Sequence, residues 1–267
     1  MDYTETRRHE LRKRRIMMVD GNLTLLLIVP LALAWRYRDR APLVGAAVGV
    51  AIAGKLFLWP LLAWLLLTRR FRATAWALGA TAALVVGVWS VIGFQGLRSY
   101  PALLRVVQDV YGVRSTSLAT VAGGFGASVA AALAIAATAG IVLLTVAVLL
   151  VRRADGDRRA FTLIIAAAII ATPVVWPNYA ALLLVPIAIT WPRLGPAWFF
   201  GYLIWLAGVL VPPLKVKPGT CCKPDGVPDL VWGWSHQVPT PWLALGITAV
   251  VLGVALAVAR TERSAIL

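Results

Sequence analysis

A single lysine lies in the middle of a long apolar stretch of this chain. Residues 41–68 contain no ionisable group other than Lys55, which lies within Gly54-Lys55-Leu56-Phe57-Leu58-Trp59-Pro60. A charge at bilayer depth is costly, so an ionisable residue there usually faces a wet cavity and marks function. A lysine ammonium is a compact point charge that suits an anionic phosphate. The alternative is that Lys55 extends its aliphatic stem to the membrane interface from a short helix.

The composition around this lysine indicates a membrane protein. Of the 267 residues, 60% are hydrophobic and 14% are charged, which is typical of a polytopic chain. The net charge of +15 would suggest a nucleic-acid partner in a soluble protein. Here many of the basic residues fall in short clusters that border apolar runs, which is the topology signal of membrane insertion. These clusters are 7–15, 36–40, 69–72 and 152–159. No basic patch is interleaved with stacking aromatic residues, so we expect no nucleic-acid partner.

Residues 41–68 could form either one helix or a hairpin. One helix would be about 42 Å long, with Lys55 at its centre, and the hydrocarbon core is only roughly 30 Å thick. A hairpin would rise over 41–54 and return over 60–68, and Gly54 and Pro60 supply the break. Charge favours the hairpin, because it places the two flanking arginine clusters together on the cytoplasmic side.

The other apolar runs predict an all-α fold, a polytopic integral membrane helix bundle of about nine embedded segments that include the broken hairpin. Residues 1–19 form a polar basic extension, and residues 20–267 form a single transmembrane domain with outer segments at 95–126 and 215–240. Apolar positions at helical spacing predict an interfacial helix in the first outer segment. Besides the hairpin, we expect embedded segments at 23–35, 73–94, 127–151, 160–175, 180–190, 197–214 and 241–259.

Three stretches carry a resemblance to a known family. Gly21-Asn22-Leu23-Thr24 is similar to a Gly-Asn opening of a helix, and Gly54-Lys55-Leu56-Phe57 with Pro60 is similar to a Lys-Pro break. Thr172-Pro173-Val174-Val175-Trp176-Pro177-Asn178-Tyr179 resembles a Ser-Pro-x-x-Trp-x-His pattern. In the order and spacing of these stretches, residues 20–193 resemble the actinobacterial members of glycosyltransferase family 87. Those GT-C enzymes include polyprenol-phosphate-mannose-dependent mannosyltransferases.

The resemblance implies a GT-C-like bundle in the bacterial plasma membrane. Its implied activity is transfer of a hexose, with mannose as the family-level expectation, from a polyprenyl phosphate sugar to a lipid or glycan acceptor at the outer face. Membrane lipids are expected partners, no cofactor is expected besides the lipid-linked donor, and a need for a divalent metal stays open. Asn178 stands where the family often has His. A transporter or channel-like subunit with Lys55 in its pathway is the alternative class.

The family's essential acidic residue in the first outer loop has no evident counterpart in this chain. The chain therefore resembles the C-terminal two-thirds of such an enzyme. A truncation ahead of Asp20 would also explain the six basic residues of 7–15, which the predicted topology otherwise places outside. Transfer to a hydroxyl needs a carboxylate as base. Asp20 is the candidate nearest to the site in sequence. The catalytic residue stays open, because helix capping or solvent exposure explains all four outer acids, Asp20, Asp109, Asp225 and Asp229.

The expected binding residues follow from this reaction. Cationic and amide donors must stabilise the departing phosphate, so Lys55 and Arg114 are the predicted ligands of the donor phosphate. Asn22 and Asn178 could instead cap helices, and the segment 114–117 could be a solvated loop. The predicted substrate-binding residues are Asn22, Trp176, Asn178, Tyr179 and Ser117.

Overall fold

The structure, a computed structural model, describes residues 23–111, 115–193, 198 and 239–260. Every element in these ranges is a helix, as the sequence predicts. The N-terminal part contains α2 (Leu23–Leu26), α3 (Ile28–Arg36), α4 (Ala41–Gly54), η1 (Leu56–Leu58), α5 (Leu61–Leu67) and α6 (Phe71–Ile92). The later part contains α7 (Gln95–Tyr111), α8 (Leu118–Gly124), α9 (Val129–Leu150), α10 (Gly156–Ala171), η3 (Pro177–Leu183), α11 (Leu184–Thr190) and α13 (Pro239–Arg260).

The hairpin around Lys55 is present. The helix α4 ends at Gly54, a turn of 3₁₀ helix follows, and α5 begins after Pro60. Arg70, after α5, lies with Nη2 at 3.4 Å from Oδ1 of Asp39, before α4. The two arginine clusters that flank the hairpin therefore meet at one end of the bundle, which excludes a single straight helix over 41–68.

The packing of α4 on α6 depends on two glycines one turn apart. A methyl group at Gly45 would lie 2.6 Å from the carbonyl oxygen of Ala73, and one at Gly49 would lie 2.6 Å from Cβ of Ala80. Small residues at this spacing let two backbones approach closely, as in membrane helix pairs. The hydroxyl of Thr81 also donates to the carbonyl of Gly49 at 3.3 Å. The α4–α6 contact therefore has no room for larger side chains at these glycines.

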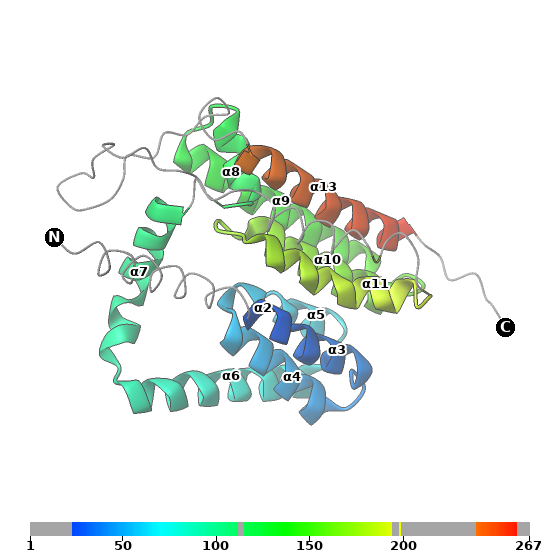
Figure 1. Cartoon of the computed structure of the whole chain (residues 1–267). Helices are drawn as coiled ribbons and strands as arrows, with labels where there is room; N and C mark the ends of the chain where they lie inside the picture. Colours follow the sequence, from blue (N-terminus) through cyan, green and yellow to red (C-terminus); the bar gives the residue numbers. More distant parts are fainter. Residues whose placement is uncertain (1–22, 112–114, 194–197, 199–238, 261–267) are drawn as a thin grey trace, which may run out of the picture.

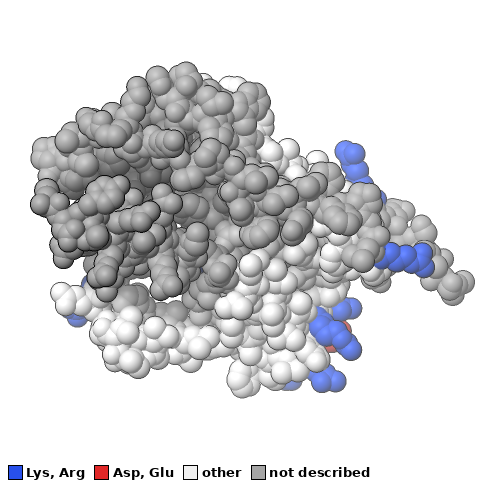
Figure 2. Space-filling view, in the orientation of Figure 1, with Lys and Arg blue, Asp and Glu red and all other residues white. Residues whose placement is uncertain are grey.

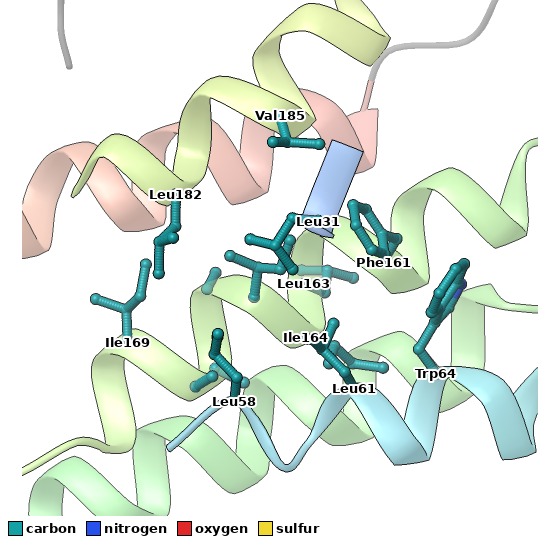
Figure 3. Packing of buried hydrophobic residues seen from close by; sticks show 14 of the residues in the cluster. Leu31, Leu58, Leu61, Trp64, Phe161, Leu163, Ile164, Ile169, Leu182 and Val185 are labelled. Carbon is teal, nitrogen blue, oxygen red and sulfur yellow. The ribbon is translucent and has the colours of Figure 1, made fainter. Parts of the chain in front are cut away.

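The core of the bundle surrounds α10. Its residues from Gly156 to Ile170 are buried apart from Asp157, as expected for a helix that is apolar over most of its circumference. Phe161 lies 4.7 Å from Trp64 and 5.4 Å from Trp35, measured between ring centroids. Figure 3 shows Phe161 and Trp64 in a cluster with aliphatic side chains of the hairpin, α3, α10, η3 and α11. The core therefore joins the N-terminal helices to the later ones.

Among the helices of the described residues, α6 and α9 are long and apolar enough to cross a membrane. In the most apolar 18-residue stretch of each helix, only 6% of α6 and 22% of α9 is buried by the rest of the described structure. A core helix of a soluble protein would be mostly covered, so these exposed apolar surfaces fit a lipid environment. The other apolar helices of the described ranges are shorter. The count of nine embedded segments stays a prediction, and the expected segment 197–214 lies almost wholly outside the described residues.

Arginines gather at one end of the bundle, which we call the arginine end. It comprises the described basic residues at or just after the ends of α3, α5, α9, α11 and α13, and those in the first turns of α6 and α10. Figure 2 shows several basic residues on the right-hand side of the molecule. The helices α3, α5, α9 and α11 end here, and α4, α6 and α10 begin here (Figure 1). Its residues are Arg36, Arg38, Arg40, Arg69, Arg70, Arg72, Arg152, Arg153, Arg158, Arg159, Arg193 and Arg260.

One carboxylate organises the arginine end. Asp157 accepts hydrogen bonds from both terminal nitrogens of Arg70, at 3.0 and 2.8 Å, and from the indole N–H of Trp64 at 2.6 Å. Nε of Arg38 lies 3.5 Å from the same carboxylate. Burial lowers the pKa of Arg70, but the bonds and charge of Asp157 and Asp39 outweigh it and hold this pKa above the usual arginine value. Asp157 thus ties α3, α5, α6 and α10 together.

Candidate functional site

The backbone at Lys55 is extended between two helical segments. The residue has φ −148° and ψ 103°, and its N–H still donates to the carbonyl of Ala51 at 3.0 Å, which closes α4. Its own carbonyl accepts from the N–H of Leu58 at 3.0 Å, which opens η1. The break therefore leaves neither backbone group of Lys55 unpaired and places its half-buried side chain at the end of the bundle opposite the arginine end.

The ammonium of Lys55 meets Tyr179, another predicted site residue. Nζ donates a hydrogen bond to the phenol oxygen at 3.1 Å and lies 5.0 Å from the centre of the ring. The ring is 5% exposed and stacks on Phe57, with centroids 4.8 Å apart and planes inclined by 11°. Lys55 and Tyr179, 124 positions apart in sequence, are thus in direct contact. Phe57 stacks on the Tyr179 ring and fixes its position beside the ammonium.

A second contact holds the segment that leads to Tyr179. The N–H of Thr116 donates to the carbonyl of Val175 at 2.7 Å, and the N–H of Val175 donates to Oγ of Ser115 at 2.9 Å. Ser115 and Thr116 are 0% and 3% exposed. The alternative that this segment is a solvated loop is therefore wrong for Ser115–Ser117, because pairing with the Thr172–Trp176 stretch buries it.

The predicted substrate residue Ser117 has a structural contact in this arrangement. Its side chain accepts from the N–H of Thr120 at 3.2 Å and lies 3.1 Å from the hydroxyl of the same residue, so it caps α8. It is 1% exposed. A direct contact between Ser117 and a sugar stays a prediction. In the structure, Ser117 is the N-cap of α8 and helps to fix the buried Ser115–Ser117 segment.

The other predicted site residues divide into two groups. Trp176 precedes η3, and Asn178 lies in η3 next to Tyr179; Trp176 is 40% exposed and Asn178 is half-buried. Asp20, Asn22 and Arg114 lie outside the described residues. The helix α2, whose first residues are the described part of the Gly21–Thr24 stretch, packs against η3. The Lys55 and Tyr179 stretches meet through their hydrogen bond.

The described acidic side chains lie at the end of the bundle opposite Lys55. Asp39, Asp155 and Asp157 form ion pairs with arginines of the arginine end. Asp109 lies on α7 with no described side chain, and Asp225 and Asp229 lie outside the described residues, as does Asp20. In the described part of the chain, no group of three His, Cys, Asp or Glu residues is placed to hold a metal ion. The observed site is therefore a cation, its aromatic support and the polar residues of η3.

Sequence reasoning missed two features of this geometry. It named Lys55 and Tyr179 separately but did not predict their hydrogen bond, because no local pattern reports a contact across 124 residues. It also treated residues 152–159 as a basic loop, whereas α10 begins at Gly156 and buries Arg158 and Arg159. The signal available was Asp157, an acid between arginines in sequence, which in the structure forms ion pairs with the distant Arg38 and Arg70.

The described helices form a bundle in which two apolar helices are long enough to cross a membrane and a broken hairpin carries Lys55. Residues 18–177, more than half of the chain, match the profile of glycosyltransferase family 87. The chain belongs to glycosyltransferase family 87. The family implies a membrane glycosyltransferase that uses a lipid-linked sugar donor and an acceptor. No curated protein and no solved structure matches the chain.

Proposed function

We propose that this chain moves a hexose, with mannose as the first candidate, from a polyprenyl phosphate sugar to an acceptor hydroxyl at the outer face of the plasma membrane. The bond between the sugar C1 and the phosphate oxygen breaks, and a bond from C1 to the acceptor oxygen forms. The acceptor proton goes to a base, for which Asp20 remains the candidate, and polyprenyl phosphate leaves with the added negative charge.

The observation that carries this proposal is the Lys55–Tyr179 contact at 3.1 Å. A phenol oxygen accepts a hydrogen bond without cancelling the charge of the ammonium, so the cation stays available to an anion. Positive groups directed at developing phosphate charge are a common source of transition-state stabilisation. We assign this role to Lys55, and the phosphate would lie beside the Phe57–Tyr179 stack.

The distribution of arginine supports the orientation. Basic residues next to membrane spans are retained in the cytoplasm, and the arginine end collects the clusters that follow α3, α5 and α9. The Lys55 end then faces outward, on the side where a polyprenyl phosphate sugar would be used in a multi-pass membrane enzyme. No feature of the described residues favours the transporter alternative.

The test is the substitution Lys55→Ala. In the membrane-embedded protein supplied with a polyprenyl phosphomannose and an acceptor alcohol, we expect release of polyprenyl phosphate to fall roughly 100- to 1,000-fold, as when one charge-stabilising donor is removed from an active site. Lys55→Arg is the matched variant, which keeps the charge and should retain partial turnover. Unchanged turnover in Lys55→Ala, with thermal unfolding like that of the parent, would remove Lys55 from the mechanism.

A further inference from the structure

A cavity of about 650 Å³ opens at the arginine end, remote from Lys55. It lies between the last residues of α5 and the last turn of α9. Its walls combine two guanidinium groups with four aliphatic side chains. The lining residues are Leu67, Arg69, Val148, Leu149, Val151 and Arg152.

The two arginines of this cavity differ from their neighbours in their partners. Arg38 and Arg70 lie on Asp157, and Arg158 lies on Asp155. Within the described ranges, the side chains of Arg69 and Arg152 make no ion pair and no hydrogen bond, and both residues are exposed. The cavity therefore holds two positive charges that the protein itself does not neutralise there.

The turn that follows α5 contains one residue in the left-handed region, Arg69. Arg69 has φ 58°, a conformation that is costly for a residue with a Cβ. Hydrogen bonds from its N–H to Leu66, at 2.9 Å, and from the N–H of Arg70 to Leu65, at 2.8 Å, hold this turn. Arg70 binds Asp157, whereas Arg69 lines the cavity. The turn thus supplies one guanidinium to the internal cluster and the next to the cavity.

The aliphatic wall belongs to a helix that can cross a membrane. Val148 and Leu149 lie in the last turn of α9 and are 48% and 67% exposed. The end of such a span lies where the hydrocarbon meets the headgroups, and basic pockets between membrane helices on the cytoplasmic side bind anionic headgroups. A soluble phosphate would use only the cations. A phospholipid would also use the aliphatic wall.

We propose that this cavity binds one anionic glycerophospholipid of the inner leaflet. Arg69 and Arg152 contact its phosphate, and Val148 and Leu149 contact its glycerol backbone and the first methylene groups of its acyl chains. The site depends on the arginine end facing the cytoplasm but not on any role of Lys55. It can therefore stand or fail separately from the glycosyltransferase reaction.

The test titrates the full chain in detergent with phosphatidylglycerol and with phosphatidylcholine, and counts retained lipid by native mass spectrometry. The double variant Arg69→Gln/Arg152→Gln should lose phosphatidylglycerol affinity by about 25-fold, from about fivefold for each basic residue at a membrane surface. The control is Arg72→Gln/Arg153→Gln, which removes the same charge from exposed arginines of the same end that do not line the cavity. This control should retain one tightly bound phosphatidylglycerol.

Two outcomes would overturn the proposal. An equal loss of affinity in both double variants would mean that phosphatidylglycerol responds to diffuse surface charge. Displacement of phosphatidylglycerol by an equal concentration of soluble glycerol phosphate would mean that the aliphatic wall contributes nothing. If Arg69→Gln disturbs the left-handed turn and prevents folding, Arg152→Gln against Arg153→Gln repeats the comparison, with about fivefold loss expected only in the first.

Discussion

The two ends of the bundle treat positive charge differently. At the arginine end, the guanidinium of Arg70 is fixed by two short bonds to Asp157, which also accepts from Trp64. At the opposite end, the ammonium of Lys55 rests on the hydroxyl and ring of Tyr179. Both groups are ordered by an aromatic residue and a hydrogen bond. Only Arg70 is also neutralised by a carboxylate.

This difference separates a structural cation from one available to a ligand. A carboxylate that binds a guanidinium through two parallel hydrogen bonds satisfies both charge and geometry, so Arg70 has little to offer an external anion. A phenol fixes the position of an ammonium and leaves its charge unmatched. Among described residues, no carboxylate pairs with Lys55. The contrast therefore predicts a structural role for the Arg70–Asp157 pair, and it supports the proposed contact of Lys55 with the donor phosphate. The two roles can be tested separately.

The largest expected effect on stability comes from Asp157→Asn. The substitution keeps the shape of the side chain but removes the charge on which Arg70 and Arg38 converge. We expect the free energy of unfolding to fall by about 1.5–3 kcal/mol, the range for hydrogen bonds to charged groups. Thermal unfolding in detergent measures this loss. Turnover of the remaining folded protein should be unchanged, because the Lys55 end is untouched.

Asp39→Asn is the matched control for this prediction. Its carboxylate lies 3.4 Å from Arg70 but is 79% exposed, so the same loss of charge should cost at most about 0.5 kcal/mol. Equal destabilisation by both substitutions would mean that stability follows the net charge of this end and not the Asp157 cluster. A loss of turnover in Asp157→Asn would mean that the two ends are coupled.

The features that the sequence predicts are those with a local cause. Gly54 and Pro60 predict the break, and the arginines at 36–40 and 69–72 predict that the chain returns to the same side. Both follow from backbone chemistry or from the cost of moving charge across a membrane. Long apolar runs likewise predict α6 and α9 to within a few residues.

The contacts that complete the site have no such local cause. The Lys55–Tyr179 hydrogen bond and the pairing of Ser115–Ser117 with Thr172–Trp176 join segments about 60 or more residues apart. Each depends on how α10 packs between the hairpin and the later helices, and helical periodicity does not encode that packing. Hydroxyl-rich sequence at 115–117 is equally typical of an exposed loop. Only the tertiary structure shows that it is buried.

A substitution in α4 tests whether the two ends can fail together. Gly49→Val places a methyl group 2.6 Å from Cβ of Ala80 and 2.8 Å from the carbonyl of Ala77, so α4 must move away from α6. We expect a loss of about 1–3 kcal/mol, the usual cost of overpacking. Because α4 connects the arginine end to Lys55, turnover should fall as well. Thermal unfolding and release of polyprenyl phosphate measure the two effects.

The control for Gly49→Val is Gly87→Val in α6. A methyl group at Gly87 has no neighbouring atom within 4 Å, so the same substitution meets open space. It should leave stability and turnover near the parent values. If Gly87→Val were as damaging as Gly49→Val, the cause would be valine in an apolar helix, and close approach of α4 to α6 would not explain the loss.

The smallest expected effect is that of Tyr179→Phe, which concerns positioning. The ring still stacks on Phe57 and still lies beside Lys55, but the acceptor of the 3.1 Å hydrogen bond is lost. A hydrogen bond of this kind contributes about 1 kcal/mol, so kcat/KM should fall roughly fivefold. The loss should appear as a higher KM for the polyprenyl phosphate sugar and weaker inhibition by polyprenyl phosphate, with little change in unfolding.

Tyr37→Phe removes a phenol hydroxyl from the arginine end and is the matched control, because its ring faces Arg36 and Arg40. It should change neither KM nor stability. A Tyr179→Phe protein with parental KM and a Tyr179→Leu protein with a greatly raised KM would show that the ring face, and not the hydroxyl, holds Lys55. Parental KM in both variants would mean that the ammonium needs no support from Tyr179, since the backbone break alone would then place it.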